Sequence, residues 1–185
     1  MSRAGRRPTR EGDERRDRIR RAACELVLAD GFDAVTHRKV AGRADVALGS
    51  VGYYFGSRDE LLVAAVEALA EPWLQAARAV AANPPDDLAD ALVRLVAGDA
   101  GRDELRVQYE RLVQAAKMPA LAARTTAWTD ELVELADQVL RDAGHTILTP
   151  RAAVALVDGL LLHHLADTGR APRTAARDEL GTVLS

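Results

Sequence analysis

The stretch DVALGSVGYYFGSRDEL, from Asp45 to Leu61, combines groups that hydrogen-bond to nucleic acid with glycines that leave a backbone uncovered. A serine hydroxyl and tyrosine phenols can donate to phosphate oxygens and to base edges. Glycine inside a helix costs roughly 0.5–1 kcal/mol relative to alanine, so Gly49 and Gly52 indicate that something outside the chain approaches this backbone closely. The chemistry that these residues favour is therefore binding to DNA rather than catalysis.

The aromatic run within this stretch allows two interpretations. Tyr53, Tyr54 and Phe55 follow one another at the predicted end of a short helix. We expect Tyr53 to contact DNA, whereas Tyr54 and Phe55 could equally be half-buried packing residues.

The flanking residues predict the elements that must position this stretch. Thr36 is placed as an N-cap between the apolar pair Val35 and Val40, which predicts a short helix over 37–44. A tight turn at 45–46 leads to a second short helix ending near residue 55, and the S-x-x-E pattern from Ser57 to Glu60 starts the next helix. A longer amphipathic helix precedes them and ends at Gly31. Two short helices joined by a tight turn form a helix-turn-helix, whose second helix enters the major groove.

Charge is distributed unevenly along the chain. Residues 1–60 hold 13 Lys and Arg against 10 Asp and Glu, whereas residues 61–185 hold 12 against 18. Nine arginines fall within residues 1–21, and such an arm attracts phosphate at long range. We expect a basic disordered arm over residues 1–12, a helix-turn-helix DNA-binding domain over 13–60, and a helical domain for ligand binding and dimerisation over 61–185.

The remaining sequence predicts helices throughout. The apolar residues are mostly Ala, Leu and Val, and only 4% of residues are aromatic, which favours an all-α protein. Helices are predicted over 57–82, with a kink at Pro72, and over 86–97, 102–116, 119–143, 150–167 and 173–184. With the three before them, they total about nine.

Several function classes lack their sequence signals. Cys24 is the only cysteine, so no disulfide or cysteine-based metal site can form within the chain. His163 and His164 are adjacent, so on a helix they point about 100° apart and cannot readily bind one ion together. No nucleophile elbow, P-loop or dinucleotide fingerprint occurs, and no apolar run is long enough to span a bilayer. We expect a cytoplasmic protein that is not an enzyme and uses no metal or cofactor.

The predicted C-terminal domain contains candidates for a small-molecule pocket and for a dimer interface. Large or adaptable side chains suit a pocket, although each could also be plain core; the candidates are Trp73, Tyr109, Met118, Trp128 and His163. The last two helices carry more apolar residues than one subunit is expected to cover; the interface candidates are Val154, Val157, Leu161, Leu165, Leu180 and Val183.

The segment DGFDAVTHRKVAGRADVALGSVGYYFGSRDELL resembles the DNA-binding domain of the TetR-type transcriptional regulators over about residues 14–66. The resemblance implies a homodimer with a four-helix interface, an inverted-repeat DNA operator, and a small-molecule effector that loosens DNA binding. It implies that Thr36, His37 and Arg38 meet phosphate or a base edge. It also implies groove-facing positions at Leu48, Gly49, Ser50, Gly52 and Tyr53, and a phosphate contact by Arg58.

The segment departs from the family pattern at three positions. Asp45 occupies a turn position often held by glycine, but aspartate can adopt a left-handed conformation. Ala47 stands where a capping serine or threonine is common, so that cap is missing or supplied elsewhere. Gly52 replaces a tyrosine that often touches phosphate.

Three hypotheses remain on the sequence alone. The leading one is a repressor released from its operator by a ligand. The second is a DNA-binding regulator without a ligand, whose C-terminal domain only dimerises. The third is a helical enzyme or carrier that uses the C-terminal domain.

Overall fold

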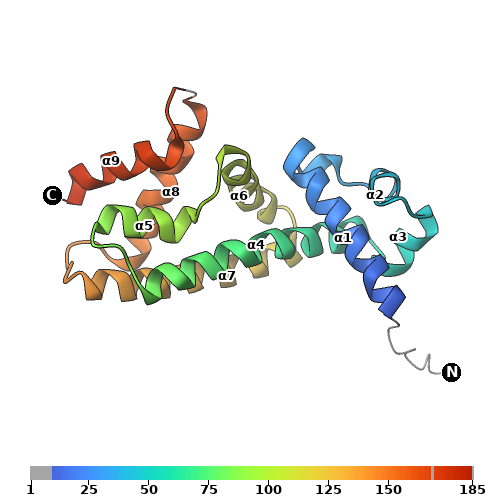
Figure 1. The fold of residues 1–185 in the computed structure, drawn as a ribbon, viewed down its shortest axis with the longest axis horizontal. Helices are drawn as coiled ribbons and strands as arrows, with labels where there is room; N and C mark the ends of the chain where they lie inside the picture. The colour runs from blue at the N-terminus through green and yellow to red at the C-terminus, as the bar shows by residue number, and fades with distance from the viewer. Residues whose placement is uncertain (1–9, 168, 185) are drawn as a thin grey trace. The chain divides into compact units, whose positions relative to one another are not determined.

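The computed structural model describes residues 10–167 and 169–184, and within these ranges the chain is helical with no strand (Figure 1). Nine α-helices and one short 3-10 helix follow one another, which confirms the predicted all-α fold. The chain divides into two compact units, of which the first ends at Ala68 and the second begins at Leu69. The predicted boundary at residue 60 lies earlier, because α4 begins in the first unit and continues into the second.

The N-terminal unit is built around a longer helix and a pair of short ones. Its elements are α1 (Arg10–Asp30), η1 (Phe32–Ala34), α2 (His37–Ala44), α3 (Leu48–Tyr54) and the first part of α4 (Arg58–Ala82). Helix α1 contacts α2, and α2 contacts α3. Residues 1–9 of the predicted arm lie outside the described residues, but residues 10–12 belong to α1, so the prediction of disorder was wrong for them.

The predicted local signals fix the ends of the short helices. The Thr36 hydroxyl accepts a hydrogen bond from the Lys39 amide at 3.2 Å. Val35 and Val40 are fully buried on either side of this cap. At the start of α4, Ser57 Oγ accepts from the Glu60 amide at 3.1 Å, as the capping pattern predicts. The Glu60 carboxylate in turn accepts from the Gly56 amide at 2.8 Å, one residue before the expected partner.

The C-terminal unit contains the rest of α4 and five further helices. These are α5 (Leu88–Ala97), α6 (Arg102–Ala115), α7 (Pro119–Asp142), α8 (Pro150–Ala166) and α9 (Pro172–Leu184). Helix α5 contacts α7, α8 and α9, and most of its residues are buried. Pro72 lies inside α4 and does not end it.

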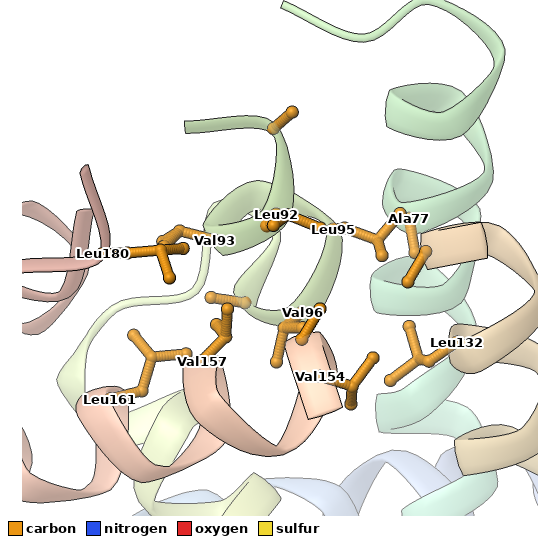
Figure 2. Packing of buried hydrophobic residues seen from close by; sticks show 14 of the residues in the cluster. Ala77, Leu92, Val93, Leu95, Val96, Leu132, Val154, Val157, Leu161 and Leu180 are labelled. Atoms are coloured by element: carbon orange, nitrogen blue, oxygen red, sulfur yellow. The ribbon is translucent and has the colours of Figure 1, made fainter. Parts of the chain in front are cut away.

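The packing of α8 and α9 corrects the predicted dimer interface. Figure 2 shows Val154, Val157 and Leu161 of α8 and Leu180 of α9 within the cluster around α5. All four are at most 4% exposed within one chain, so their prediction as partner-facing residues was wrong. Helix α8 also packs against α6 and α7, and these contacts cover its apolar side.

A different part of α8 and α9 remains uncovered. Leu165 is half-buried, whereas Val183 is 61% exposed. On α8 the exposed positions Ala155, Gly159 and Leu162 are separated by four and three residues, so they lie along one face of the helix.

Candidate DNA-binding surface and ligand site

Helix α3 has one face exposed to solvent and the opposite face packed against the protein. Leu48 and Tyr53 are 55% and 80% exposed, whereas Val51 is fully buried. A Cβ atom added to Gly49 or Gly52 would meet no atom within 4 Å among the described residues. Internal packing therefore does not require glycine at these positions, and the exposed face offers an uncovered helical backbone to a partner.

The three consecutive aromatic residues at the end of α3 differ in burial. Tyr53 packs edge-on against Tyr54, with ring centroids 5.0 Å apart, and Tyr54 is half-buried. Phe55 is only 2% exposed and lies beneath the Arg16 guanidinium, 5.5 Å from the ring centroid. Of the two residues for which the sequence left packing open, Phe55 is therefore an internal anchor.

The other residues predicted to contact DNA differ in exposure and in the hydrogen bonds that they already make. Arg38 is exposed, and Ser50 is half-buried. The side chain of Thr36 is exposed but its hydroxyl already serves as the cap of α2. These contacts with DNA remain predictions.

His37 and Arg58 make contacts to the protein's own main chain. His37 Nε2 lies 2.9 Å from the Phe55 carbonyl oxygen, so this nitrogen carries the proton and donates. Arg58 donates from Nε to Val35 O at 2.9 Å and from Nη2 to Phe32 O at 2.8 Å. His37 thus joins the start of α2 to the end of α3, and Arg58 joins the start of α4 to the segment before α2. A role in positioning the short helices accompanies any contact of these residues with phosphate.

Two of the departures from the family pattern have clear structural outcomes. Asp45 adopts the left-handed conformation with φ 51° and ψ 54°, so the turn forms without glycine. Ala47 occupies the N-cap position of α3 and supplies no side-chain hydrogen bond. Helix α3 therefore begins without the stabilisation that a serine or threonine would provide.

In the C-terminal unit, two of the predicted pocket residues contact an arginine that the sequence did not single out. The Arg111 guanidinium carbon lies 5.5 Å from the ring centroid of Trp73 and 5.0 Å from that of Trp128. The Trp73 indole is held in place because its Nε1 donates to Val96 O at 2.6 Å. We call Trp73, Tyr109, Arg111, Trp128 and Asp158 the Arg111 cluster.

The Arg111 cluster keeps a cation and a carboxylate largely away from water. Arg111 is 6% exposed, and this burial lowers the pKa of its guanidinium to about 10, although Asp158 partly opposes the shift. Burial also raises the pKa of the Asp158 carboxyl to about 6, against the hydrogen bond from Tyr109 and the charge of Arg111. The Tyr109 hydroxyl donates to Asp158 at 3.1 Å, and burial followed by the charge of Asp158 raises the pKa of Tyr109.

The cluster also contains a buried donor with nothing to accept its hydrogens. Arg111 Nη1 is buried and has no hydrogen-bond partner in the part of the chain that the structure describes. The Thr125 hydroxyl is in the same condition, and Thr125 precedes Trp128 by one turn on the same face of α7. A buried polar group without a partner costs about 1–3 kcal/mol, so a group that accepts a hydrogen bond from Arg111 Nη1 would stabilise the chain.

The other two predicted pocket residues, Met118 and His163, are not part of the Arg111 cluster. Met118 is 8% exposed and occupies the N-cap position of α7. His163 is exposed on α8, so its prediction as a residue lining a buried pocket was wrong. Its neighbour His164 instead pairs with Glu179 at 3.1 Å.

Sequence reasoning missed Arg111 and Asp158. Asp158 had a detectable signal, since it is the only acid inside the apolar helix RAAVALVDGLLLHHLA. Arg111 had none, because its neighbours Glu110 and Leu112 fit an ordinary amphipathic helix.

Two open hollows also occur in the surface of this unit. One of about 700 Å³ is lined by the ends of α5, α6 and α9, including Arg102, Arg173 and Arg177. Another of about 570 Å³ lies beside Pro84 and Gly98. Neither hollow is lined by any of the five predicted pocket residues.

Two kinds of feature are absent from the described ranges. No group of three or more His, Cys, Asp or Glu residues in them is arranged to hold a metal ion. None of their helices is long and apolar enough to cross a membrane.

Comparison with known proteins agrees with this two-unit arrangement. Residues 19–65 match the model for bacterial regulatory proteins of the tetR family, and residues 83–185 match the model for the tetracyclin repressor-like C-terminal domain. The crystal structure of the multidrug binding protein EbrR complexed with imidazole has a TM-score of 0.74 and 31% identity, covering 100% of this chain and 97% of that one. Its complex with ethidium gives a TM-score of 0.72 and 31% identity, covering 92% and 99%.

Curated sequences match over a shorter region. The HTH-type transcriptional repressor KstR of Rhodococcus jostii (strain RHA1) is 49% identical over 53 residues, which are 29% of this chain and 25% of KstR. KstR of Mycobacterium tuberculosis (strain ATCC 25618 / H37Rv) is 47% identical over 53 residues, 29% of this chain and 24% of that protein. The match thus spans about a quarter of these relatives. Since the two family models together cover most of the chain, it belongs to the TetR family of bacterial regulatory proteins.

Proposed function

We propose that this chain is a transcriptional repressor that binds an inverted-repeat operator as a homodimer and releases it when a small molecule binds the C-terminal unit. The observation that carries the DNA-binding part is the outward face of α3, where Tyr53 is 80% exposed and the backbone at Gly49 and Gly52 is uncovered. The two KstR repressors are similar to this chain over 53 residues.

The docking that we propose places α3 in the major groove. Tyr53 then faces the DNA, while Val51 and Phe55 hold the helix on the protein. Arg38 and Lys39 are both exposed near the start of α2, where they can neutralise phosphate. Binding should therefore combine sequence selection by α3 with a salt-dependent contribution from these cations.

DNA selection tests this proposal directly. The purified protein is incubated with random duplex DNA, and the retained fragments are sequenced after several rounds. We expect an inverted repeat whose half-sites are about one helical turn apart, with affinity that falls steeply as salt rises. Recovery of no common sequence at moderate salt would remove specific DNA binding from the proposal.

For dimerisation we propose the exposed faces of α8 and α9 rather than their buried ones. Ala155, Gly159 and Leu162 lie on one face of α8, and Val183 is exposed on α9. Small residues allow two helices to approach closely, and the two apolar side chains would be covered by the partner.

Adjacent leucines on α8 separate this interface from the core. Leu162 is 52% exposed, whereas Leu161 is fully buried. We expect Leu162→Glu to yield a folded monomer in sedimentation, and Leu161→Glu to unfold the C-terminal unit by circular dichroism. A Leu162→Glu protein that remains a dimer at low micromolar concentration would place the interface elsewhere.

The proposed response to a small molecule rests on the Arg111 cluster and on the EbrR complexes with imidazole and ethidium. The regulator without a ligand remains the alternative function. Release of the selected operator by any compound that binds the C-terminal unit separates the two.

A further inference from the structure

We infer that the ligand of the C-terminal unit is an organic carboxylate, whose anionic group binds the buried edge of Arg111 while its apolar body packs against the two indole rings. This inference rests on the proposed function, because it assigns a chemical class to the small molecule that the proposal requires.

The Arg111 guanidinium is covered on its faces by indole rings, whereas one of its edges has no hydrogen-bond acceptor within the residues that the structure describes. Trp73 and Trp128 contact Arg111 through their ring faces, and cation–π contacts leave the donors at the guanidinium edge free for hydrogen bonds in its plane. Arg111 Nη1 lies at such an edge, buried and without an acceptor among the described residues. The group that completes this site must therefore accept hydrogen bonds, and a carboxylate accepts from a guanidinium fork with the best geometry.

Asp158, the acid of the cluster, does not occupy this edge of Arg111. Asp158 binds the Tyr109 hydroxyl at 3.1 Å, and no hydrogen bond or ion pair joins Asp158 to Arg111 in the described part of the chain. Asp158 thus compensates the charge of Arg111 at longer range without occupying its edge. An incoming anion takes that edge, and the raised pKa of Asp158 makes proton uptake by this carboxyl the natural way to keep the cluster neutral.

A cationic ligand fits the Arg111 cluster less well than an anionic one. A cation placed between the indoles would lie beside the buried charge of Arg111 and would still leave Nη1 without an acceptor. The buried hydroxyl of Thr125, one turn from Trp128, is a second group that can donate to an anion.

The two indole rings differ in how firmly they are held. Trp73 is held by its hydrogen bond to Val96 O, whereas Trp128 makes no hydrogen bond to any described residue. Both rings are partly buried, so each also has atoms in contact with solvent.

The chain provides its own spectroscopic probe of this site. Trp73 and Trp128 are its two tryptophans, so intrinsic tryptophan emission reports on the Arg111 cluster and on no other tryptophan environment. We propose titrating the full-length protein with benzoate, 3-phenylpropanoate and octanoate. The amine and the alcohol of each carbon skeleton serve as probes matched in size.

The expected result is a saturable change in tryptophan emission with at least one carboxylate, at least tenfold tighter than with its matched amine or alcohol. Arg111→Met should weaken this binding at least tenfold, and Arg111→Lys, which keeps the charge but not the fork, at least threefold. Arg106→Met changes a half-buried arginine on the same helix, which pairs with Glu110, and should leave binding within twofold of wild type.

Asp158→Asn distinguishes an anion site from a cation site, because the two predict changes in affinity of opposite sign. The asparagine side chain still offers an oxygen that accepts the hydrogen bond from Tyr109. Removal of the competing negative charge should tighten carboxylate binding at least threefold, whereas a cation site would lose affinity. A response to the amines with weakening by Asp158→Asn, or no response to any carboxylate, overturns the inference.

Operator binding distinguishes this failure from failure of the proposed function. Release of the selected DNA by an amine or an alcohol would retain a ligand-responsive repressor and reject only the carboxylate class. A wild-type protein that selects no DNA would reject the proposed function, whatever the fluorescence shows.

Discussion

Tyr53 of α3 is 80% exposed and its neighbouring glycines face open space, whereas Arg111 of α6 is 6% exposed and lies against two indole rings. The first region leaves its polar groups in water, where DNA can displace that water on binding. The second has already removed a cation and a carboxylate from water before any ligand arrives. Substitutions on α3 should therefore change DNA binding with little effect on folding. Substitutions in the Arg111 cluster should change both ligand binding and folding.

The largest effect is expected at Gly52, where a substitution should weaken DNA binding without lowering the stability of the protein. Gly52→Leu should lower specific operator affinity at least 100-fold, equivalent to about 3 kcal/mol, because the new side chain blocks close approach of the helix. The thermal unfolding free energy should remain unchanged or rise by roughly 0.5–1 kcal/mol, since leucine favours the helix and the added Cβ meets nothing within 4 Å.

Gly52→Ala provides the graded control. Alanine adds only one methyl group, so its loss of affinity should be smaller than that of leucine. A Gly52→Leu protein that unfolds at higher temperature yet binds operator with unchanged affinity would place this face of α3 away from DNA.

The next largest effect is expected in the Arg111 cluster, where a substitution should change the free energy of unfolding. The pKa of Asp158 is about 6 in the folded chain and near 3.8 in the unfolded chain, so the folded state binds this proton more tightly. Stability from this group therefore increases as pH falls through 6 toward 4, and above pH 6 the ionised carboxylate is destabilising by up to about 3 kcal/mol. Asp158→Asn should raise the free energy of unfolding by about 1–3 kcal/mol at pH 8.

The pH dependence identifies the cause of that gain. The difference between Asp158→Asn and wild type should shrink as pH falls from 8 to 4.5 in denaturant titrations. Asp130→Asn, which removes an exposed ion pair with Arg151, should show a small difference over this range. A variant that is instead less stable at pH 8 would mean that attraction between Asp158 and Arg111 exceeds their desolvation.

A smaller effect on affinity is expected at the Tyr53 hydroxyl. Tyr53→Phe keeps the ring and removes one hydrogen bond to DNA, so it should lower operator affinity by about 1–1.5 kcal/mol, or roughly tenfold. Its unfolding free energy should match wild type. Tyr54→Phe offers the comparison, because Tyr54 is half-buried and packs edge-on against Tyr53, so its hydroxyl should contribute less affinity. Equal losses at both positions would show that the two hydroxyls are not distinguished by the DNA.

The smallest effect concerns the missing cap of α3. Ala47 already has the extended conformation of an N-cap, with φ −62° and ψ 142°. Ala47→Ser can therefore bond a free amide of the first turn and should stabilise the N-terminal unit by about 0.5–1 kcal/mol. Unfolding followed by circular dichroism measures the change, and a loss of stability would indicate that the serine hydroxyl binds elsewhere.

The N-terminal unit could be predicted closely from the sequence because its signals are local. Thr36 caps α2 through an amide three residues away, and Asp45 turns the chain through its own backbone conformation. The same reasoning failed for α8, where Leu161 and Leu162 are equally apolar and only the packing of other helices decides which is buried. It also missed Arg111, because its two tryptophan contacts come from α4 and α7, far away in the sequence.

Helix α3 has seven residues, two glycines and no side-chain cap. A helix this short is marginal by itself, and its fully buried residue Val51 provides limited anchorage. Its amide hydrogens should therefore exchange with solvent faster than those of α1, through local opening that does not require the whole unit to unfold. Binding to DNA would slow that exchange, and the entropy lost on ordering the helix would weaken association with every operator alike, leaving the choice among sequences to the contacts themselves.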